Sequence, residues 1–141
     1  MTEPQPDQKP IEGKEQLNIK VLLVDDDPSI LGLSKRSLEG MGCTVETAIN
    51  GQEALDKIFN SDPGEFGLVI SDKEMPKVGG IETLKRIHTD ERFKDLPMIL
   101  YSGALTPDDE KAVEVLGGSC LKKPFTLDKF KTTVLGAVRK P

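Results

Sequence analysis

Reactive side chains stand at the ends of four short, mostly apolar runs of this 141-residue sequence. Asp25 and Asp26 follow the first of these runs, and Asp72 follows another. Ser102 and Lys123 follow two later runs. The set contains three carboxylates, one hydroxyl and one ammonium group, and it can act as a unit only if the fold brings the four run ends to one place.

Together these groups suit one kind of chemistry. Three converging carboxylates repel one another, and a bound divalent cation lowers that cost. Oxygen ligands without histidine or cysteine favour a hard cation, most simply Mg²⁺. A lysine adds a compact positive charge and a hydroxyl adds a hydrogen-bond donor. Phosphoryl transfer needs a nucleophile and charges that neutralise the phosphoryl oxygens, and an aspartate can be that nucleophile by forming an aspartyl phosphate.

Apolar runs and helical patterns alternate five times along the chain. Helix-spaced apolar residues and short continuous apolar runs distinguish the two kinds of element. The runs predict strands over 19–24, 43–48, 68–71, 97–101 and 120–122. The helical patterns predict helices that contain residues 30–41, 54–59, 81–87, 112–116 and 127–138.

This alternation predicts an α/β fold, with a doubly wound parallel sheet covered by helices on both faces. Working sites of such sheets lie beyond the carboxyl ends of the strands. The five reactive side chains stand at those ends. We therefore expect them to form a single site.

At these residues the sequence resembles the response-regulator receiver domain, the phosphoacceptor of two-component signalling, to which the chemotaxis receivers belong. The matching segments are VLLVDDDPSI, LVISDKEMP followed by GG, MILYSGA and LKKPF, in that order. The resemblance covers residues 19–139. It implies a flavodoxin-like fold with five helices and a five-stranded parallel sheet in the order 2-1-3-4-5.

The resemblance also implies a role for each acidic residue. Asp72 would accept the phosphoryl group and contact a Mg²⁺ ion. Asp26 would bind the ion directly, and Asp25 would support it mostly through water. Glu74 would offer its backbone carbonyl to the ion. The acidic pair of the family directly follows its strand, which leaves Asp27 to cap the first helix.

The lysine and the hydroxyl take their roles from the same resemblance. Lys123 would pair with the carboxylate of Asp72 and then with the phosphoryl oxygens, and its peptide bond to Pro124 would be cis. Ser102 would donate a hydrogen bond to the phosphoryl group and so report its presence.

Two positions depart from the family pattern. Receivers commonly carry an aromatic residue three positions before the active lysine, and here that residue is Cys120. A cysteine is too small to move between a buried and an exposed pocket, so we expect no aromatic-coupled switch. Gly79 stands where an aspartate is common. The negative charge of Glu74 is expected to disfavour the attack of water on the phosphoryl group.

The implied function is that of a signalling phosphoacceptor, which promotes only its own phosphotransfer and autodephosphorylation. A histidine kinase or histidine phosphotransfer protein would donate the phosphoryl group, and the downstream target or output domain stays open. One alternative is a receiver-like docking module that takes no phosphate, to which Cys120 gives some weight. Another is a haloacid-dehalogenase-like phosphatase with Asp25 as nucleophile and Asp27 as acid.

The composition of the chain excludes some classes of function. Hydrophobic residues make up 36% of the chain and charged residues 30%, and the net charge is −5. The chain therefore lacks the basic excess of a nucleic-acid binder, and no apolar run approaches the roughly 20 residues of a membrane span. Two cysteines without a CxxC pair favour a cytoplasmic protein. Residues 1–18 are polar and proline-rich, which predicts a flexible tail before a receiver domain over 19–139.

Overall fold

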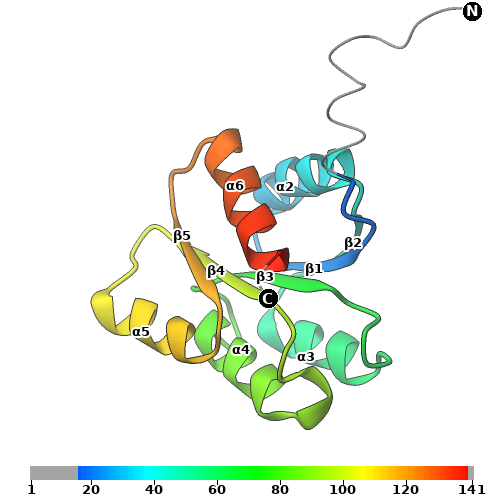
Figure 1. Ribbon diagram of the computed structural model, residues 1–141. Coiled ribbons are helices and arrows are strands. Elements are labelled where there is room, and N and C mark those ends of the chain that lie inside the picture. The colour runs from blue at the N-terminus through cyan, green and yellow to red at the C-terminus, as the bar shows by residue number, and fades with distance from the viewer. Residues whose placement is uncertain (1–15, 140–141) are drawn as a thin grey trace, which may run out of the picture.

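Five parallel strands form the centre of the structure, a computed structural model that describes residues 16–139 (Figure 1). Their order across the sheet is β2-β1-β3-β4-β5, so the predicted fold class is confirmed. The strands are β1 (Lys20–Val24), β2 (Thr44–Ala48), β3 (Leu68–Asp72), β4 (Met98–Ser102) and β5 (Ser119–Lys122).

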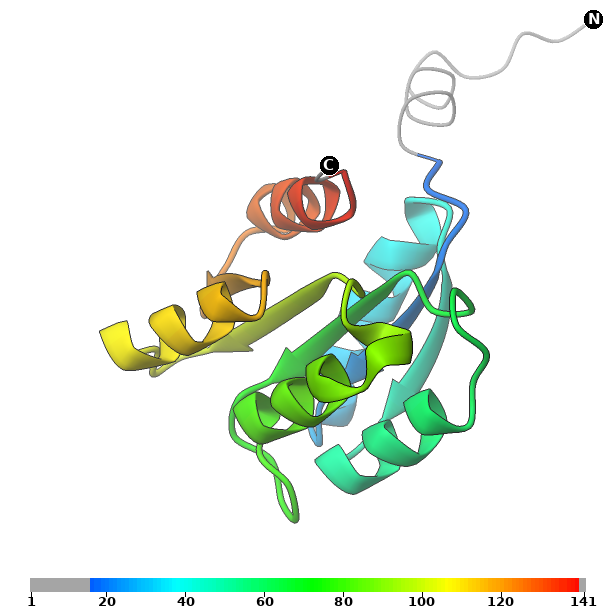
Figure 2. The same ribbon diagram turned by 60° about the horizontal axis from the view of Figure 1, so that its bottom comes forward.

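Five α-helices of the described part of the chain cover the sheet. Figures 1 and 2 show α3, α4 and α5 on one face and α2 and α6 on the other. A short 3₁₀ helix, η1 (Glu91–Phe93), follows α4 and has no counterpart in the prediction. The helices are α2 (Pro28–Gly40), α3 (Gly51–Phe59), α4 (Gly80–Thr89), α5 (Pro107–Val115) and α6 (Leu127–Val138).

Both faces of β1 are buried, which explains its continuous apolar sequence. Val21 and Leu23 pack into the core beneath α2 and α6. Leu22 and Val24 pack into the core on the opposite face, with α3 and α4. Because side chains alternate across a strand, a sheet covered on both sides needs apolar residues at every position.

The strand ends lie level at one edge of the sheet. Asp72 pairs with Tyr101, and Ser102 pairs with Lys122. Lys123 is the next residue after β5. Since this pairing continues to the strand ends, β3 and β4 each run one residue further than predicted, to Asp72 and Ser102.

Helices start at the same edge, and polar side chains cap the first turns of α2, α3, α5 and α6, whereas α4 begins after Gly79 without a side-chain cap. The side chain of Asp27 accepts a hydrogen bond from the backbone N–H of Ser29, 2.9 Å away, and so caps α2 as expected. Thr106 and Asp109 form a reciprocal capping box at the start of α5. These caps fix the loops that carry the site residues.

Most of the predicted tail over residues 1–18, namely residues 1–15, lies outside the described residues. The backbone N–H of Leu17 donates to the carbonyl of Met41 at 2.9 Å, and that of Asn18 donates to the carbonyl of Gly42 at 3.0 Å. These two residues are therefore tied to the loop before β2. Within residues 16–139, no helix has both the length and the apolar character that crossing a membrane requires.

Candidate functional site

Three acidic side chains meet at the carboxyl edge of the sheet. Asp25 and Asp26 follow β1, and Asp72 ends β3. One carboxylate oxygen from each lies within 4.8 Å of the other two. Asp25 and Asp72 are buried, while Asp26 is exposed. The structure therefore brings together the acidic residues that the sequence singles out.

The cluster fits a hard divalent cation. Its donors are carboxylate oxygens, without sulfur or imidazole. Burial raises the pKa of Asp72, and the neighbouring charge of Asp25 raises it further. A cation held by Asp25, Asp26 and Asp72 would offset this repulsion. The backbone carbonyl of Glu74, in the loop after β3, stays a predicted ligand.

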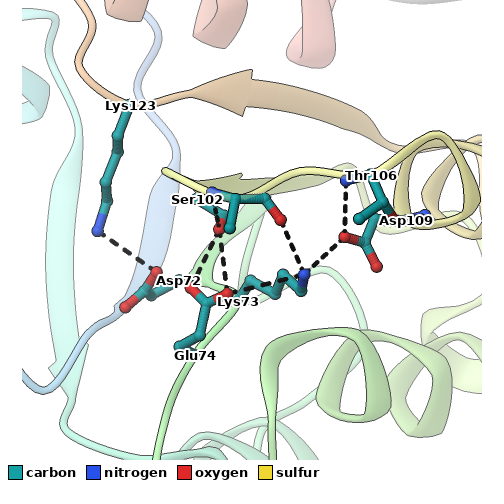
Figure 3. A network of polar contacts seen from close by, with 8 residues as sticks. Asp72, Lys73, Glu74, Ser102, Thr106, Asp109 and Lys123 are labelled. Atoms are coloured by element: carbon teal, nitrogen blue, oxygen red, sulfur yellow. Dashed lines mark hydrogen bonds and ion pairs between the residues drawn. The ribbon is translucent and has the colours of Figure 1, made fainter.

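Lys123 reaches the acidic cluster from the end of β5. Its Nζ lies 3.4 Å from Oδ1 of Asp72 and 4.0 Å from Oδ2 of Asp25. Figure 3 shows the lysine side chain extending toward Asp72. The peptide bond between Lys123 and Pro124 is cis, as predicted. The ammonium group is thus placed to neutralise charge at Asp72.

Ser102 stands at the end of β4 and is fully buried. Its hydroxyl donates to the carboxylate of Glu74, with 3.0 Å between Oγ and Oε1. The same oxygen accepts the backbone N–H of Ala104 at 2.9 Å. Figure 3 shows that the carboxylate of Glu74 is the present partner of this hydroxyl.

Lys73 is a site neighbour to which the sequence assigned no role. Its Nζ lies 2.6 Å from Oδ2 of Asp109 in the first turn of α5, and it donates to the carbonyl of Ala104 at 2.9 Å. The hydrogen bond between Lys73 and Asp109 raises the pKa of Lys73 and lowers the pKa of Asp109. The residue beside Asp72 is therefore linked to α5 (Figure 3). No local pattern pairs two residues so far apart in the chain.

Tyr101 is the second residue that sequence reasoning missed. It is buried on β4, and its hydroxyl donates a hydrogen bond to Oδ2 of Asp25. Burial is the main cause that raises the pKa of Tyr101, and the bond to Asp25 adds to it. A signal was available, because a buried tyrosine usually places its hydroxyl against a polar partner.

Cys120 occupies its expected place on β5, paired with Leu100. It is half-buried and packs against the core on the side of α4 and α5. Burial raises the pKa of its thiol, so the sulfur stays protonated at neutral pH.

Comparison with known proteins decides the family. The family model described as the response regulator receiver domain matches residues 21–135. The chain belongs to the response regulator receiver domain family. It is a receiver domain of two-component signalling, and receivers are signalling domains rather than turnover enzymes. The resemblance drawn from the sequence is thereby confirmed.

Relatives of this receiver domain include proteins of different lengths. It is 42% identical over 111 residues to the transcriptional regulatory protein CpxR homologue of Haemophilus influenzae, covering 75% of this chain and 44% of that protein. It is 32% identical over 122 residues to protein PilG of Pseudomonas aeruginosa, covering 86% and 85%. The chain thus spans less than half of the first relative and most of the second.

Solved structures agree with this assignment. The chemotaxis response regulator CheY4 of Vibrio cholerae superposes with a TM-score of 0.76 at 31% identity, covering 84% of this chain and 98% of that one. The phosphatase alternative loses its proposed acid, because Asp27 caps α2 and lies outside the acidic cluster.

Proposed function

We propose that Asp72 accepts a phosphoryl group from a phosphohistidine of a histidine kinase or histidine phosphotransfer protein, and that this changes a protein-binding surface. The observation that carries the proposal is the position of Lys123 Nζ, 3.4 Å from Asp72, which is one of three clustered carboxylates. Lone acidic clusters are common on protein surfaces. A buried aspartate that faces both acids and a lysine is suited to covalent phosphoryl chemistry.

The transfer follows from the groups present. A carboxylate oxygen of Asp72 attacks phosphorus, and the bond from phosphorus to the donor's imidazole nitrogen breaks. The bonding electrons return to that nitrogen, which takes up a proton. Lys123 pairs with the phosphoryl oxygens, and the hydroxyl of Ser102 donates to one of them. Mg²⁺ held by Asp25, Asp26, Asp72 and the carbonyl of Glu74 would supply the remaining positive charge.

Protonation of Asp72 works against this reaction, because only the carboxylate is a nucleophile. Burial and Asp25 raise the pKa of Asp72. The charge of Lys123 and its hydrogen bond lower that pKa and so oppose the shift. We therefore assign Lys123 a second task, which is to keep the nucleophile ionised before the donor arrives.

A mainly apolar groove beside Lys123 supports a helical donor. Its walls come from Ile30 and Leu33 of α2 and from Pro124 and Phe125 after β5. Leu33 is 62% exposed, so its side chain is open to a partner at this groove. An amphipathic helix that presents its phosphohistidine can pack its apolar face in such a groove.

Several finer assignments belong to the same proposal. Residues 19–139 form the receiver unit. The domain promotes only its own phosphotransfer and autodephosphorylation, and it works in the cytoplasm, where the donor's kinase domain faces it. Its downstream target is a protein, and the domain does not bind nucleic acid directly.

The test is an intact-mass spectrum of the full chain after incubation with Mg²⁺ and acetyl phosphate. We expect one added phosphoryl group, absent from Asp72→Asn and from a sample with EDTA. No adduct after rapid quenching would contradict the proposal and favour the docking module. Continuous release of phosphate from a small phosphate ester, without a stable adduct, would favour a phosphatase instead.

A further inference from the structure

Tyr101 contacts two groups of the proposed phosphoacceptor site at once. Its hydroxyl donates to Oδ2 of Asp25, and Nζ of Lys123 lies 4.7 Å from the centroid of its ring. Tyr101 is 1% exposed, so its hydroxyl and ring are shielded from solvent.

The hydroxyl completes the orientation of Asp25. Oδ1 of Asp25 accepts the backbone N–H of Asp27 at 2.9 Å, and Oδ2 accepts the hydroxyl of Tyr101. Two donors on opposite oxygens hold the plane of the carboxylate. A phenol hydroxyl is a hydrogen-bond donor, and the carboxylate of Asp25 can only accept. A donor that fixes a metal-binding side chain is a recurrent feature of metal sites.

The ring is held just as firmly. Phe125 meets Tyr101 edge-on, with 6.1 Å between ring centroids, and stacks on Phe130 at 5.7 Å. The ring face is thereby fixed beneath the ammonium group of Lys123, where a cation–π contact is favourable. The hydroxyl of Tyr101 is hydrogen-bonded to Asp25. The ammonium group above the ring lies nearer to Asp72 than to Asp25, with Nζ of Lys123 at 3.4 Å and 4.0 Å from the two carboxylates.

We propose that Tyr101 is a positioning residue of the phosphoacceptor site: its hydroxyl orients Asp25 toward the cation, and its ring holds Lys123 beside Asp72. This inference rests on the proposed function, since it concerns binding of Mg²⁺ and the lysine of the same site. It assigns the tyrosine a task that packing alone does not require.

Tyr101→Phe tests the hydroxyl with the least disturbance, because it removes one oxygen and keeps the ring. Phe130→Leu is the matched control, since it loosens the same aromatic stack without touching Asp25. Isothermal titration of each 141-residue chain with Mg²⁺ gives its dissociation constant. We expect Tyr101→Phe to raise that constant about tenfold, the lower end of the range for lost orienting partners. Phe130→Leu should leave it within about twofold while lowering the melting temperature.

The wild-type chain offers a second measurement that needs no variant. It contains one tyrosine and no tryptophan, so its tyrosine fluorescence reports Tyr101 alone. We expect Mg²⁺ to change that emission with the dissociation constant found by calorimetry. Tyrosine emission that does not change when Mg²⁺ binds would overturn the proposal that the hydroxyl of Tyr101 orients Asp25.

The outcomes separate this inference from the function on which it rests. Equal Mg²⁺ affinity of Tyr101→Phe and wild type would overturn the role of Tyr101 and leave the phosphoacceptor proposal standing. An equal loss in Phe130→Leu would also overturn it, because packing would then explain the effect. A wild-type chain that binds no Mg²⁺ would overturn both.

Discussion

The hydroxyl of Ser102 donates a hydrogen bond to the carboxylate of Glu74, with 3.0 Å between Oγ and Oε1. In the proposed reaction, this same hydroxyl must turn to a phosphoryl oxygen on Asp72. Glu74 therefore competes with the phosphoryl group for Ser102. It also places a negative charge beside the phosphorylation site, in a side chain that is 59% exposed.

Glu74→Asn should shorten the lifetime of the phosphorylated protein. The carboxylate disfavours the approach of the attacking water, and its removal lowers that barrier by about 1 kcal/mol, or roughly fivefold in rate. Decay of the phosphorylated mass after removal of the phosphodonor measures the lifetime. Glu74→Gln keeps the length of the side chain and removes only its charge, so it should decay as fast. An unchanged lifetime in both variants would contradict the charge argument.

Lys73→Met should loosen the start of α5. The substitution removes both the ion pair with Asp109 and the hydrogen bond to the carbonyl of Ala104. Hydrogen exchange at the amides of residues 104–110 should become faster, and high salt should reduce the difference between variant and wild type. Lys111→Met, on the exposed side of the same helix, is the control. Equal exchange in both variants would show that the pair does not hold α5.

Gly80→Ala should disturb the site through the backbone. A Cβ at this position would lie 2.1 Å from the carbonyl oxygen of Asp72 and 2.9 Å from the side chain of Leu100. Relief of such overlap costs about 1–3 kcal/mol and moves the loop after β3. We expect a lower midpoint of urea unfolding and slower phosphorylation by acetyl phosphate.

Gly79→Ala is the adjacent control, because the nearest atom to its Cβ would be 3.6 Å away and its backbone is extended. It should unfold within about 0.5 kcal/mol of the wild type. A Gly79 variant that is destabilised as much as the Gly80 variant would contradict the proposed clash.

Asp72→Asn should stabilise the protein in EDTA at neutral pH. Burial and Asp25 raise the pKa of Asp72 above its ordinary value of 3.8. Between the two values the folded state binds more protons than the unfolded state, so the stability of the wild type falls as pH rises through the raised pKa. The asparagine variant does not lose stability in this way. Its advantage in urea unfolding should be present at pH 7 and shrink toward pH 3.

Mg²⁺ should reverse the order of stability of the two proteins, so that the wild type becomes more stable than Asp72→Asn. A cation that binds only the folded state stabilises it by about 2.7 kcal/mol at a hundred times its dissociation constant. Wild type should gain this amount, and Asp72→Asn should gain less because it lacks one carboxylate. A larger gain in the variant than in the wild type would contradict the metal assignment.

The sequence predicted the position of Asp72 and Lys123 for a physical reason. Strands buried on both faces have continuous apolar sequences, and parallel strands end at one edge, so residues 51 positions apart were expected to meet. The order of the strands came from the resemblance, because apolar runs carry no information about which strands are neighbours.

The contacts of Lys73 with Asp109 and of Tyr101 with Asp25 could not be predicted in the same way. They depend on side-chain rotamers and on which loop faces which, and the strand pattern specifies neither. The one-residue extension of β3 and β4 has a different origin, which is the backbone pairing of the strands. Backbone pairing between Asp72 and Tyr101 continues past the point where the apolar pattern stops.

The most direct test of the proposed phosphorylation of Asp72 locates the phosphoryl group. The full chain is phosphorylated with acetyl phosphate and Mg²⁺ and reduced with borohydride, which converts a phosphorylated aspartate to homoserine, and its peptides are sequenced by mass spectrometry. We predict homoserine at position 72 in the wild type and at no position in Asp72→Asn. Homoserine at Asp25 or Asp26, or an unmodified position 72 in a protein that carries the phosphoryl mass, would contradict it.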